Sequence, residues 1–370
     1  YAYWHLGRCC LSAQGGEPLV SRAKPKSQRR KGRPCHELLD KEKQEVRVAS
    51  RETFVGRRRQ TREALRVFAD QEYAGVLLYA IGGSGKSSLA ARIADRLEPT
   101  FKAAVLYRNY QPFDVLQTLG AAARGAKEEV DFPKLIAQVQ AQPGDFKDVL
   151  LDLLEGVFDQ QPILLVLDDL EQHVLEALSG DRKEAEVKPE YQATLTAIIE
   201  AFDEADTESR LLLTSRYKFV VRNRYGDDVA ARLKAINVPD MTATELKMHW
   251  LALQETAQGE REEGEQDSQY LQRIYEAGKG NPGLQHLLFQ PLLKGETIAL
   301  DRALERIGKY RATQTEQGDL SVDDLDKYLQ RIALEVYSRA LSDTELQLLR
   351  LLTLFDFPVP EELLLQAGPK

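Results

Sequence analysis

Short apolar segments alternate with amphipathic stretches between residues 51 and 239. The apolar segments span residues 76–79, 103–107, 163–167, 211–214 and 235–238. Stretches with helical spacing separate them, among them residues 87–97 and 191–202. Strands that are apolar throughout are typical of parallel sheets whose two faces are both covered by helices. The pattern therefore predicts an α/β fold with a doubly wound parallel sheet over residues 51–239.

The pattern changes to helical spacing after the last of these segments. Apolar residues then recur every three or four positions, which predicts a helical domain over residues 240–319. Thr242 and Glu245 have the spacing of a capping box and mark the start of its first helix. The acidic stretch 260–267 is predicted to be an exposed loop. A new apolar block over residues 320–370 predicts part of a third domain.

The first 50 residues have a different composition from the rest. Residues 21–33 carry seven lysines and arginines and almost no apolar side chains, which favours a solvated linker over a nucleic-acid or targeting patch. Because the chain begins with Tyr1 and has no apolar leader, we interpret it as part of a longer polypeptide, with the tail of a preceding domain before the linker.

The three cysteines, Cys9, Cys10 and Cys35, also lie in this region. An oxidised secreted fold would distribute an even number of cysteines through its core, so we expect a reducing, cytoplasmic location. Together with His36 these cysteines are an alternative metal site. The 24 residues between Cys10 and Cys35 and the lack of a second CxxC pair favour ordinary thiols.

Overall composition and charge limit the possible partners. Hydrophobic residues make up 43% of the chain and charged residues 29%, as in ordinary globular proteins. No apolar run approaches the roughly 18–20 residues of a membrane-spanning helix, so no membrane partner is expected. The net charge of −8 disfavours extensive nucleic-acid binding, because phosphate contacts require clustered positive charge.

A glycine-rich segment follows the first predicted strand and precedes a helical stretch. It reads Ala80-Ile81-Gly82-Gly83-Ser84-Gly85-Lys86-Ser87-Ser88 and has the form GxxxxGK[ST], with alanine in place of the first glycine. Glycines allow backbone N–H groups to surround phosphates where side chains would collide. The segment therefore predicts a phosphate-binding loop, in preference to an ordinary glycine-rich turn.

Three residues of this loop have individual predicted roles. Lys86 places a positive charge toward a γ-phosphate, Ser87 offers a hydroxyl group to Mg²⁺, and Ser88 reaches the α-phosphate. The predicted cofactors are ATP or ADP and Mg²⁺. The loop residues expected to hold them are Gly82, Gly83, Ser84, Gly85, Lys86, Ser87 and Ser88.

Two carboxylates and an arginine follow later apolar strands. Asp168 directly follows the segment 163–167, where it is expected to bind Mg²⁺, and Asp169 is expected to orient or deprotonate the attacking water. Two acids after a strand also serve as helix caps, which is the alternative for Asp169. Arg216 follows the segment 211–214 and is expected to contact the γ-phosphate, the alternative being a surface ion pair. The predicted catalytic residues are thus Lys86, Asp169 and Arg216.

The order of these motifs resembles the STAND NTPases. The double-glycine loop is similar to that of NB-ARC and NACHT proteins, Phe54-Val55-Gly56-Arg57 resembles the motif that precedes it, and Gly280-Asn281-Pro282-Gly283-Leu284 resembles the motif of the helical domain. The resemblance implies that Val55, Gly56, Arg57 and Pro282 contact the nucleotide base. It also implies a winged-helix domain from about residue 320. Residues 3–6, followed by residues 15–20, resemble the tail of a CHAT domain, which precedes some bacterial STAND cores.

These observations lead to one main hypothesis and two alternatives. The main hypothesis is a slow ATPase that switches between ADP and ATP states and so controls self-association and an attached effector, with effector and sensor domains outside this chain. The first alternative is an AAA+-like motor that remodels protein or nucleic acid. A DNA-binding regulator acting through the winged helix is disfavoured by the acidic balance of the chain.

Overall fold

The computed structural model describes most of the chain between residues 53 and 315. The gaps in this range are 99, 108, 125–129, 177–183, 257–264, 294 and 296, and the stretches 39–40, 45–46 and 48–49 precede it. The predicted basic linker, the cysteines with His36, the CHAT-like segment and the third domain over residues 320–370 lie outside the described residues.

Five parallel strands form the central sheet, in the order β4-β5-β7-β3-β9. They are β3 (Gly75–Tyr79), β4 (Lys102–Tyr107), β5 (Ile163–Asp168), β7 (Arg210–Ser215) and β9 (Leu233–Asn237). Each strand contains one of the five predicted apolar segments or most of it, so the predicted parallel sheet is confirmed. After β3 the chain passes to β4 at one edge of the sheet, whereas β9 adds on the other side of β3. Ligands bind at such a reversal of strand order, outside the carboxyl ends of the strands.

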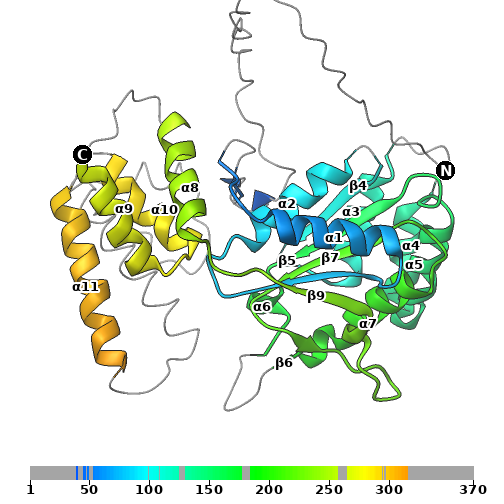
Figure 1. Cartoon of the computed structure of the whole chain (residues 1–370). Helices are drawn as coiled ribbons and strands as arrows, with labels where there is room; N and C mark the ends of the chain where they lie inside the picture. The colour runs from blue at the N-terminus through cyan, green and yellow to red at the C-terminus, as the bar shows by residue number, and fades with distance from the viewer. Residues whose placement is uncertain are drawn as a thin grey trace, which may run out of the picture. The chain divides into compact units, whose positions relative to one another are not determined.

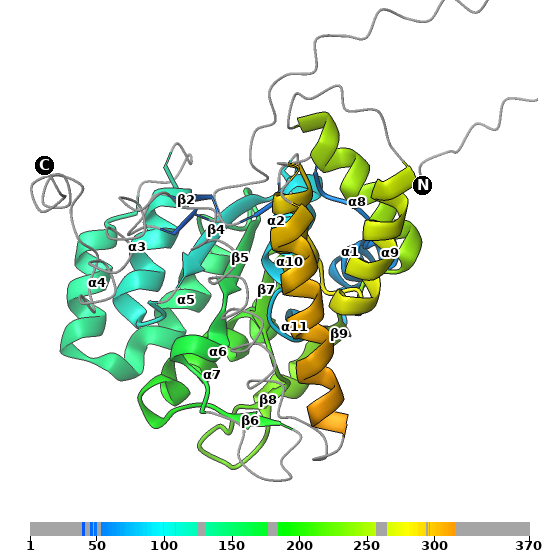
Figure 2. The ribbon, with the colours of Figure 1, turned by 90° about the vertical axis from the view of Figure 1, so that its left-hand side faces the viewer.

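Helices cover both faces of this sheet (Figure 1 and Figure 2). One face is covered by α1 (Arg58–Asp70) and α2 (Lys86–Leu97), and the other by α3 (Pro112–Ala122), α4 (Phe132–Ala141), α5 (Phe146–Glu155) and α7 (Pro189–Glu204). Successive residues of β5 enter opposite layers: Leu165 and Leu167 join the cluster with α3, α4, α5 and α7, and Leu164 and Val166 join the cluster with α1 and α2. This alternation explains why the strands are apolar throughout.

Shorter elements connect these helices and strands. They are β1 (Leu39–Asp40), β2 (Glu45–Val46), the 3₁₀ helix η1 (Pro143–Asp145), α6 (Leu170–His173), β6 (Ala185–Glu186), β8 (Phe219–Val220) and the 3₁₀ helix η2 (Val229–Arg232). Strands β1 and β2 pair antiparallel, and β6 pairs parallel with β8. Of these, α6 bears on the site, because it begins at Leu170, two residues after the last residue of β5.

Four helices follow β9 in the described part of the chain, and we call them the helical segment. They are α8 (Ala243–Thr256), α9 (Glu265–Gly278), α10 (Pro282–Leu293) and α11 (Thr297–Thr315). They share a hydrophobic cluster in which Trp250 and Phe289 are fully buried, with ring centroids 5.2 Å apart. Aromatic rings at this separation add to the stabilisation from buried area.

The start of α8 has the predicted capping box. The backbone N–H of Thr242 donates to Glu245 Oε2 over 2.9 Å, and the backbone N–H of Glu245 donates to Thr242 Oγ1 over 3.3 Å. The two side chains thus satisfy backbone groups that the helix itself leaves unpaired.

The prediction of an exposed acidic loop over residues 260–267 is wrong for its last three residues. Helix α9 begins at Glu265, so residues 265–267 are helical, while 257–264 are outside the described part. Carboxylates in the first turn of a helix interact favourably with its dipole, so this acidic run favours a helix start as well as a loop.

No helix among the described residues is long and apolar enough to cross a membrane.

Candidate functional site

The glycine-rich loop connects β3 to α2 and has the backbone of a phosphate cradle. Gly83 and Gly85 have φ values of 71° and 86°, in the left-handed region that glycine adopts without strain. Helix α2 begins at Lys86, so its first N–H groups face the space enclosed by the loop. Ala80, which replaces the usual first glycine, does not have a positive φ and is buried. Alanine therefore fits at this position.

Lys86 lies within this loop and is held by its backbone. Its Nζ donates to the carbonyl oxygens of Ala80 over 3.0 Å and Ile81 over 3.4 Å. The same Nζ lies 3.5 Å from Glu171 Oε1, and both side chains are buried. The lysine is thus fixed beside the loop by two carbonyl groups and one carboxylate.

Asp168 is the last residue of β5 and is almost completely buried. Its carboxylate accepts a hydrogen bond from Thr214 Oγ1 over 2.6 Å, and the hydroxyl of Tyr110 donates to its backbone carbonyl. Burial raises the pKa of Asp168, while hydrogen bonds from Thr214 and Ser87 oppose the increase. The bond to Ser87 brings the two predicted Mg²⁺ ligands together.

These two residues fit the ligand preference of Mg²⁺, which binds one or two protein oxygens and takes the rest from phosphate and water. No cluster of three or more histidine, cysteine, aspartate or glutamate side chains with metal-ligand geometry occurs within the described ranges. A cation at Ser87 and Asp168 would therefore depend on phosphate and water oxygens for most of its coordination.

Glu171 is a site residue that we did not predict from the sequence. Its Oε1 lies 3.5 Å from Lys86 Nζ and 3.3 Å from Arg216 Nε. Burial raises the pKa of Glu171 to about 7, and the charge of Asp169 adds to the increase while that of Lys86 opposes it. One buried carboxylate thus lies between the two cations that we expect to contact a γ-phosphate. The signal in the sequence was the acidic residue three positions after Asp168.

Asp169 has an unusual backbone conformation between β5 and α6. Its φ is 68°, which is uncommon for a residue that is not glycine, and its N–H donates to Thr214 Oγ1 over 2.9 Å. Burial raises the pKa of Asp169, and the nearby charge of Asp168 raises it further. Asp169 is also the residue before the first turn of α6, where it makes no side-chain cap. The cap alternative is therefore not realised, and the carboxylate lines the cavity beside Lys86.

Arg57 precedes α1 and binds the backbone of the phosphate loop. Its guanidinium donates to the carbonyl of Ser84 over 2.9 Å and to the carbonyl of Pro239, and only 4% of the residue is exposed. Burial lowers the pKa of Arg57, and the charges of Glu245 and Asp240 oppose the decrease. Val55 and Arg57 both line the cavity, whereas Gly56 lies outside its lining and packs against Glu245.

The start of α10 contacts the phosphate loop directly. Asn281 Nδ2 donates to the carbonyl of Gly82 and the backbone N–H of Gly283 donates to the carbonyl of Gly83, both over 2.8 Å. Asn281 Oδ1 also accepts from the N–H of Leu284, so one side chain both caps α10 and binds the loop. A Cβ at Gly283 would lie 2.9 Å from Gly83 Cα, so this approach requires glycine. We call the two hydrogen bonds between α10 and the loop the α10 clasp.

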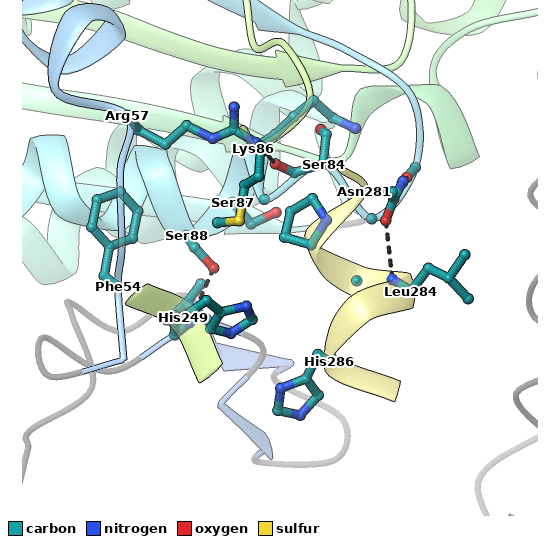
Figure 3. Close-up of a pocket in the computed structure, with 18 of the residues that line it drawn as sticks. Phe54, Arg57, Ser84, Lys86, Ser87, Ser88, His249, Asn281, Leu284 and His286 are labelled. Atoms are coloured by element: carbon teal, nitrogen blue, oxygen red, sulfur yellow. Dashed lines mark hydrogen bonds between the residues drawn. The ribbon is translucent and has the colours of Figure 1, made fainter. Parts of the chain in front are cut away.

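The cavity enclosed by these elements has a volume of about 760 Å³. It is lined by the loop together with the charged residues Asp168, Asp169, Glu171 and Arg216, and also by Phe54, Val55, Met241, Leu253, Pro282 and two histidines, His249 and His286. Figure 3 shows the histidines projecting into the cavity from α8 and α10, and Ser87 and Ser88 on its loop side. The predicted residues from Gly82 to Ser88 and Pro282 are thus brought together at one cavity. A cavity lined by both charged and apolar side chains suits a nucleotide.

Residues 53–217 match the family model described as an AAA ATPase domain. The P-loop ATPase domain predicted from the motifs is thus borne out for these residues. The chain contains a nucleotide-binding ATPase domain of the P-loop class, with the parallel sheet and flanking helices of that fold. No curated protein matches the chain in sequence.

Solved structures resemble the chain only distantly. A STAND protein with a tetratricopeptide repeat sensor from Pyrococcus horikoshii is 15% identical at a TM-score of 0.41, over 84% of this chain and 36% of that one. This chain thus spans about a third of the length of that protein. Cdc6p from Pyrobaculum aerophilum is 13% identical at a TM-score of 0.40, over 65% of this chain and 62% of that one. Domain III of the replication initiation protein DnaA from Thermotoga maritima is 17% identical at a TM-score of 0.40, over 67% of this chain and 88% of that one.

Proposed function

We propose that the chain is an adenine-nucleotide switch of the STAND type. Bound ADP keeps the helical segment clasped to the phosphate loop, and ATP with Mg²⁺ opens it for self-association and for activation of an attached effector. Slow hydrolysis returns the chain to the ADP state. The effector and sensor of this proposal lie outside this chain.

The α10 clasp is the observation that carries this proposal. Asn281 and Gly283 bind carbonyl oxygens of the same loop whose N–H groups face the phosphate site. A change in loop conformation on exchange of ADP for ATP would therefore alter both hydrogen bonds. The position of the helical segment is in this way linked to the phosphate site by direct contact, as a ligand-driven change between two states requires.

The cluster of Lys86, Glu171 and Arg216 supplies a means of distinguishing ATP from ADP. Glu171 lies between the two cations, and a γ-phosphate would replace its carboxylate as their anionic partner. Moving a two-state equilibrium from 1:99 to 99:1 requires a difference in binding free energy of about 5.5 kcal/mol. A phosphate held by Lys86, Arg216 and Mg²⁺ can provide a difference of this size.

The test is to identify the nucleotide that the purified chain retains and to measure its turnover. We expect mass spectrometry of the heat-denatured protein to find ADP, and steady-state hydrolysis of ATP to be slower than the roughly 10 per second of a typical enzyme. Many turnovers per second, together with rings formed without a signal, would instead identify an AAA+-like motor. Absence of any nucleotide binding would remove the proposal altogether.

Replacing Gly283 with valine is expected to break the α10 clasp. The new side chain would collide with the backbone of Gly83, and loss of two hydrogen bonds of about 1 kcal/mol each should accelerate ADP release by roughly tenfold or more. The release rate of a fluorescent ADP analogue measures this effect. Gly308→Val on α11 is the control, since nothing lies within 4 Å of a Cβ there. An unchanged rate for Gly283→Val would show that the clasp does not hold the nucleotide.

A further inference from the structure

Helix α1 carries a row of arginines on the side that faces away from the sheet. Arg58, Arg62 and Arg66 follow one another at intervals of four residues, and all three are exposed. The other side of α1 is buried against the sheet through residues such as Ala64 and Phe68. None of the three guanidinium groups makes a hydrogen bond or an ion pair within the described part of the chain. We call these three arginines the basic row.

A cavity of about 1140 Å³ adjoins the basic row. Its lining includes arginines of α1 and α2 and two apolar residues of α8 that are 47% and 40% exposed, namely Arg58, Arg59, Arg62, Arg92, Arg96, Met248 and Leu251. Arginine and methionine are enriched at protein interfaces. Three carboxylates, those of Asp240, Glu245 and Glu255, also line the cavity, and they disfavour a ligand as rich in phosphate as nucleic acid. This surface therefore suits an acidic face of a protein.

Helix α5 carries such an acidic face. Asp148, Asp152 and Glu155 are exposed on the side of α5 that is opposite to the hydrophobic core. None of these carboxylates makes an ion pair within the described ranges. The neighbouring Lys147 forms its ion pairs with two glutamates of α7, over 3.4 Å and 2.7 Å. We call the three carboxylates the acidic row.

The two rows match in length but cannot meet within one chain. At a rise of 1.5 Å per residue, the basic row extends over about 12 Å and the acidic row over about 10 Å. Arginine and carboxylate groups form the strongest hydrogen-bonded ion pairs of proteins when they meet in matched geometry. The sheet separates α1 from α5, because each helix packs on a different face of it (Figure 2). The acidic row can therefore reach the basic row of another copy only.

We propose that the chain associates with itself head-to-tail, with the acidic row of one copy docked on the basic row of the next. This inference rests on the proposed function and deepens it, since it names the surfaces through which the copies associate. Because the two rows lie on opposite faces, a docked copy still presents one free row. Such a heterologous contact produces a ring where the rotation between copies closes, and a filament where it does not.

The experiment reverses the charge of each row and then mixes the two variants. The α1 variant is Arg62→Glu with Arg66→Glu, and the α5 variant is Asp148→Lys with Asp152→Lys. We expect sedimentation velocity with Mg²⁺ and a non-hydrolysable ATP analogue to show each variant alone associating about tenfold more weakly than the original chain. An equimolar mixture should regain the original association, because every contact between the two variants again joins rows of opposite charge. A misfolded variant could not restore it.

A control and a second measurement separate the rows from general effects of charge. Arg302→Glu with Lys309→Glu changes the net charge as the α1 variant does, at exposed positions of α11 that belong to neither row. This control should associate as the original chain does. The second measurement needs no variant. Raising the salt concentration from about 0.1 M to 1 M shortens the Debye length from about 10 Å to 3 Å, so association of the original chain should weaken.

Several results would overturn this interface. They are undiminished association of either variant, a mixture that stays monomeric, and association that does not respond to salt. Tight binding of a fluorescent DNA duplex that the α1 variant loses would assign the basic row to nucleic acid instead. Calorimetry with the ATP analogue separates these failures from that of the proposed function. A chain that binds the analogue and stays monomeric would exclude the interface alone, whereas a chain that does not bind it would remove the nucleotide switch as well.

Discussion

Replacing Lys86 with alanine is expected to abolish measurable binding of ATP and ADP. The side chain is the one buried lysine among the described residues, and it is directed by the carbonyls of Ala80 and Ile81 into the phosphate loop. A charge-assisted contact to phosphate in such a site is worth about 3 kcal/mol, which corresponds to a loss of roughly a hundredfold in affinity or more. Isothermal titration calorimetry on the purified variant measures the effect.

The fold is expected to survive this substitution. Glu171 would lose one of its two cations but would keep Arg216, and with a pKa of about 7 it can also take up a proton. Lys134→Ala provides the matched control, because Lys134 is exposed on α4 and does not line the cavity. A Lys86→Ala protein that is folded by circular dichroism and binds ATP with unchanged affinity would exclude Lys86 from the nucleotide site.

The five strands and the phosphate loop could be predicted because their signals are local. A strand such as β5 is apolar at every position since both of its faces are covered, and a glycine loop that leads into Lys86 at the start of a helix is typical of a phosphate site. The position of Asp168 beside the loop followed from the meeting of parallel strands at their carboxyl ends. These inferences needed only the order of the residues along the chain.

Other contacts at the site could not be predicted because they join distant parts of the chain. Asn281 is 199 residues away from Gly82, whose carbonyl it binds, and the sequence does not specify how the helical segment meets the loop. Arg57 was assigned to the base by resemblance, and this contact stays a prediction. The hydrogen bonds of its guanidinium to the backbone of Ser84 and Pro239 were not predicted.

Asp169→Asn is expected to retain ATP binding and to lose hydrolysis. The substitution keeps the size of the side chain and removes the carboxylate that we propose to orient or deprotonate the attacking water. Loss of a general base lowers turnover by about 10²- to 10⁴-fold. Release of inorganic phosphate in a single-turnover experiment measures the chemical step, and calorimetry with a non-hydrolysable ATP analogue measures binding.

Glu171→Gln is the matched comparison, because both carboxylates line the cavity and burial raises the pKa of each. Glutamine cannot compete with a γ-phosphate for Lys86 and Arg216, so we expect this variant to bind the ATP analogue several-fold more tightly than the original chain. If Glu171 only partners these cations, hydrolysis in Glu171→Gln should persist while Asp169→Asn is inactive. The reverse result, with normal turnover in Asp169→Asn and none in Glu171→Gln, would transfer the role of base from Asp169 to Glu171 in the first turn of α6.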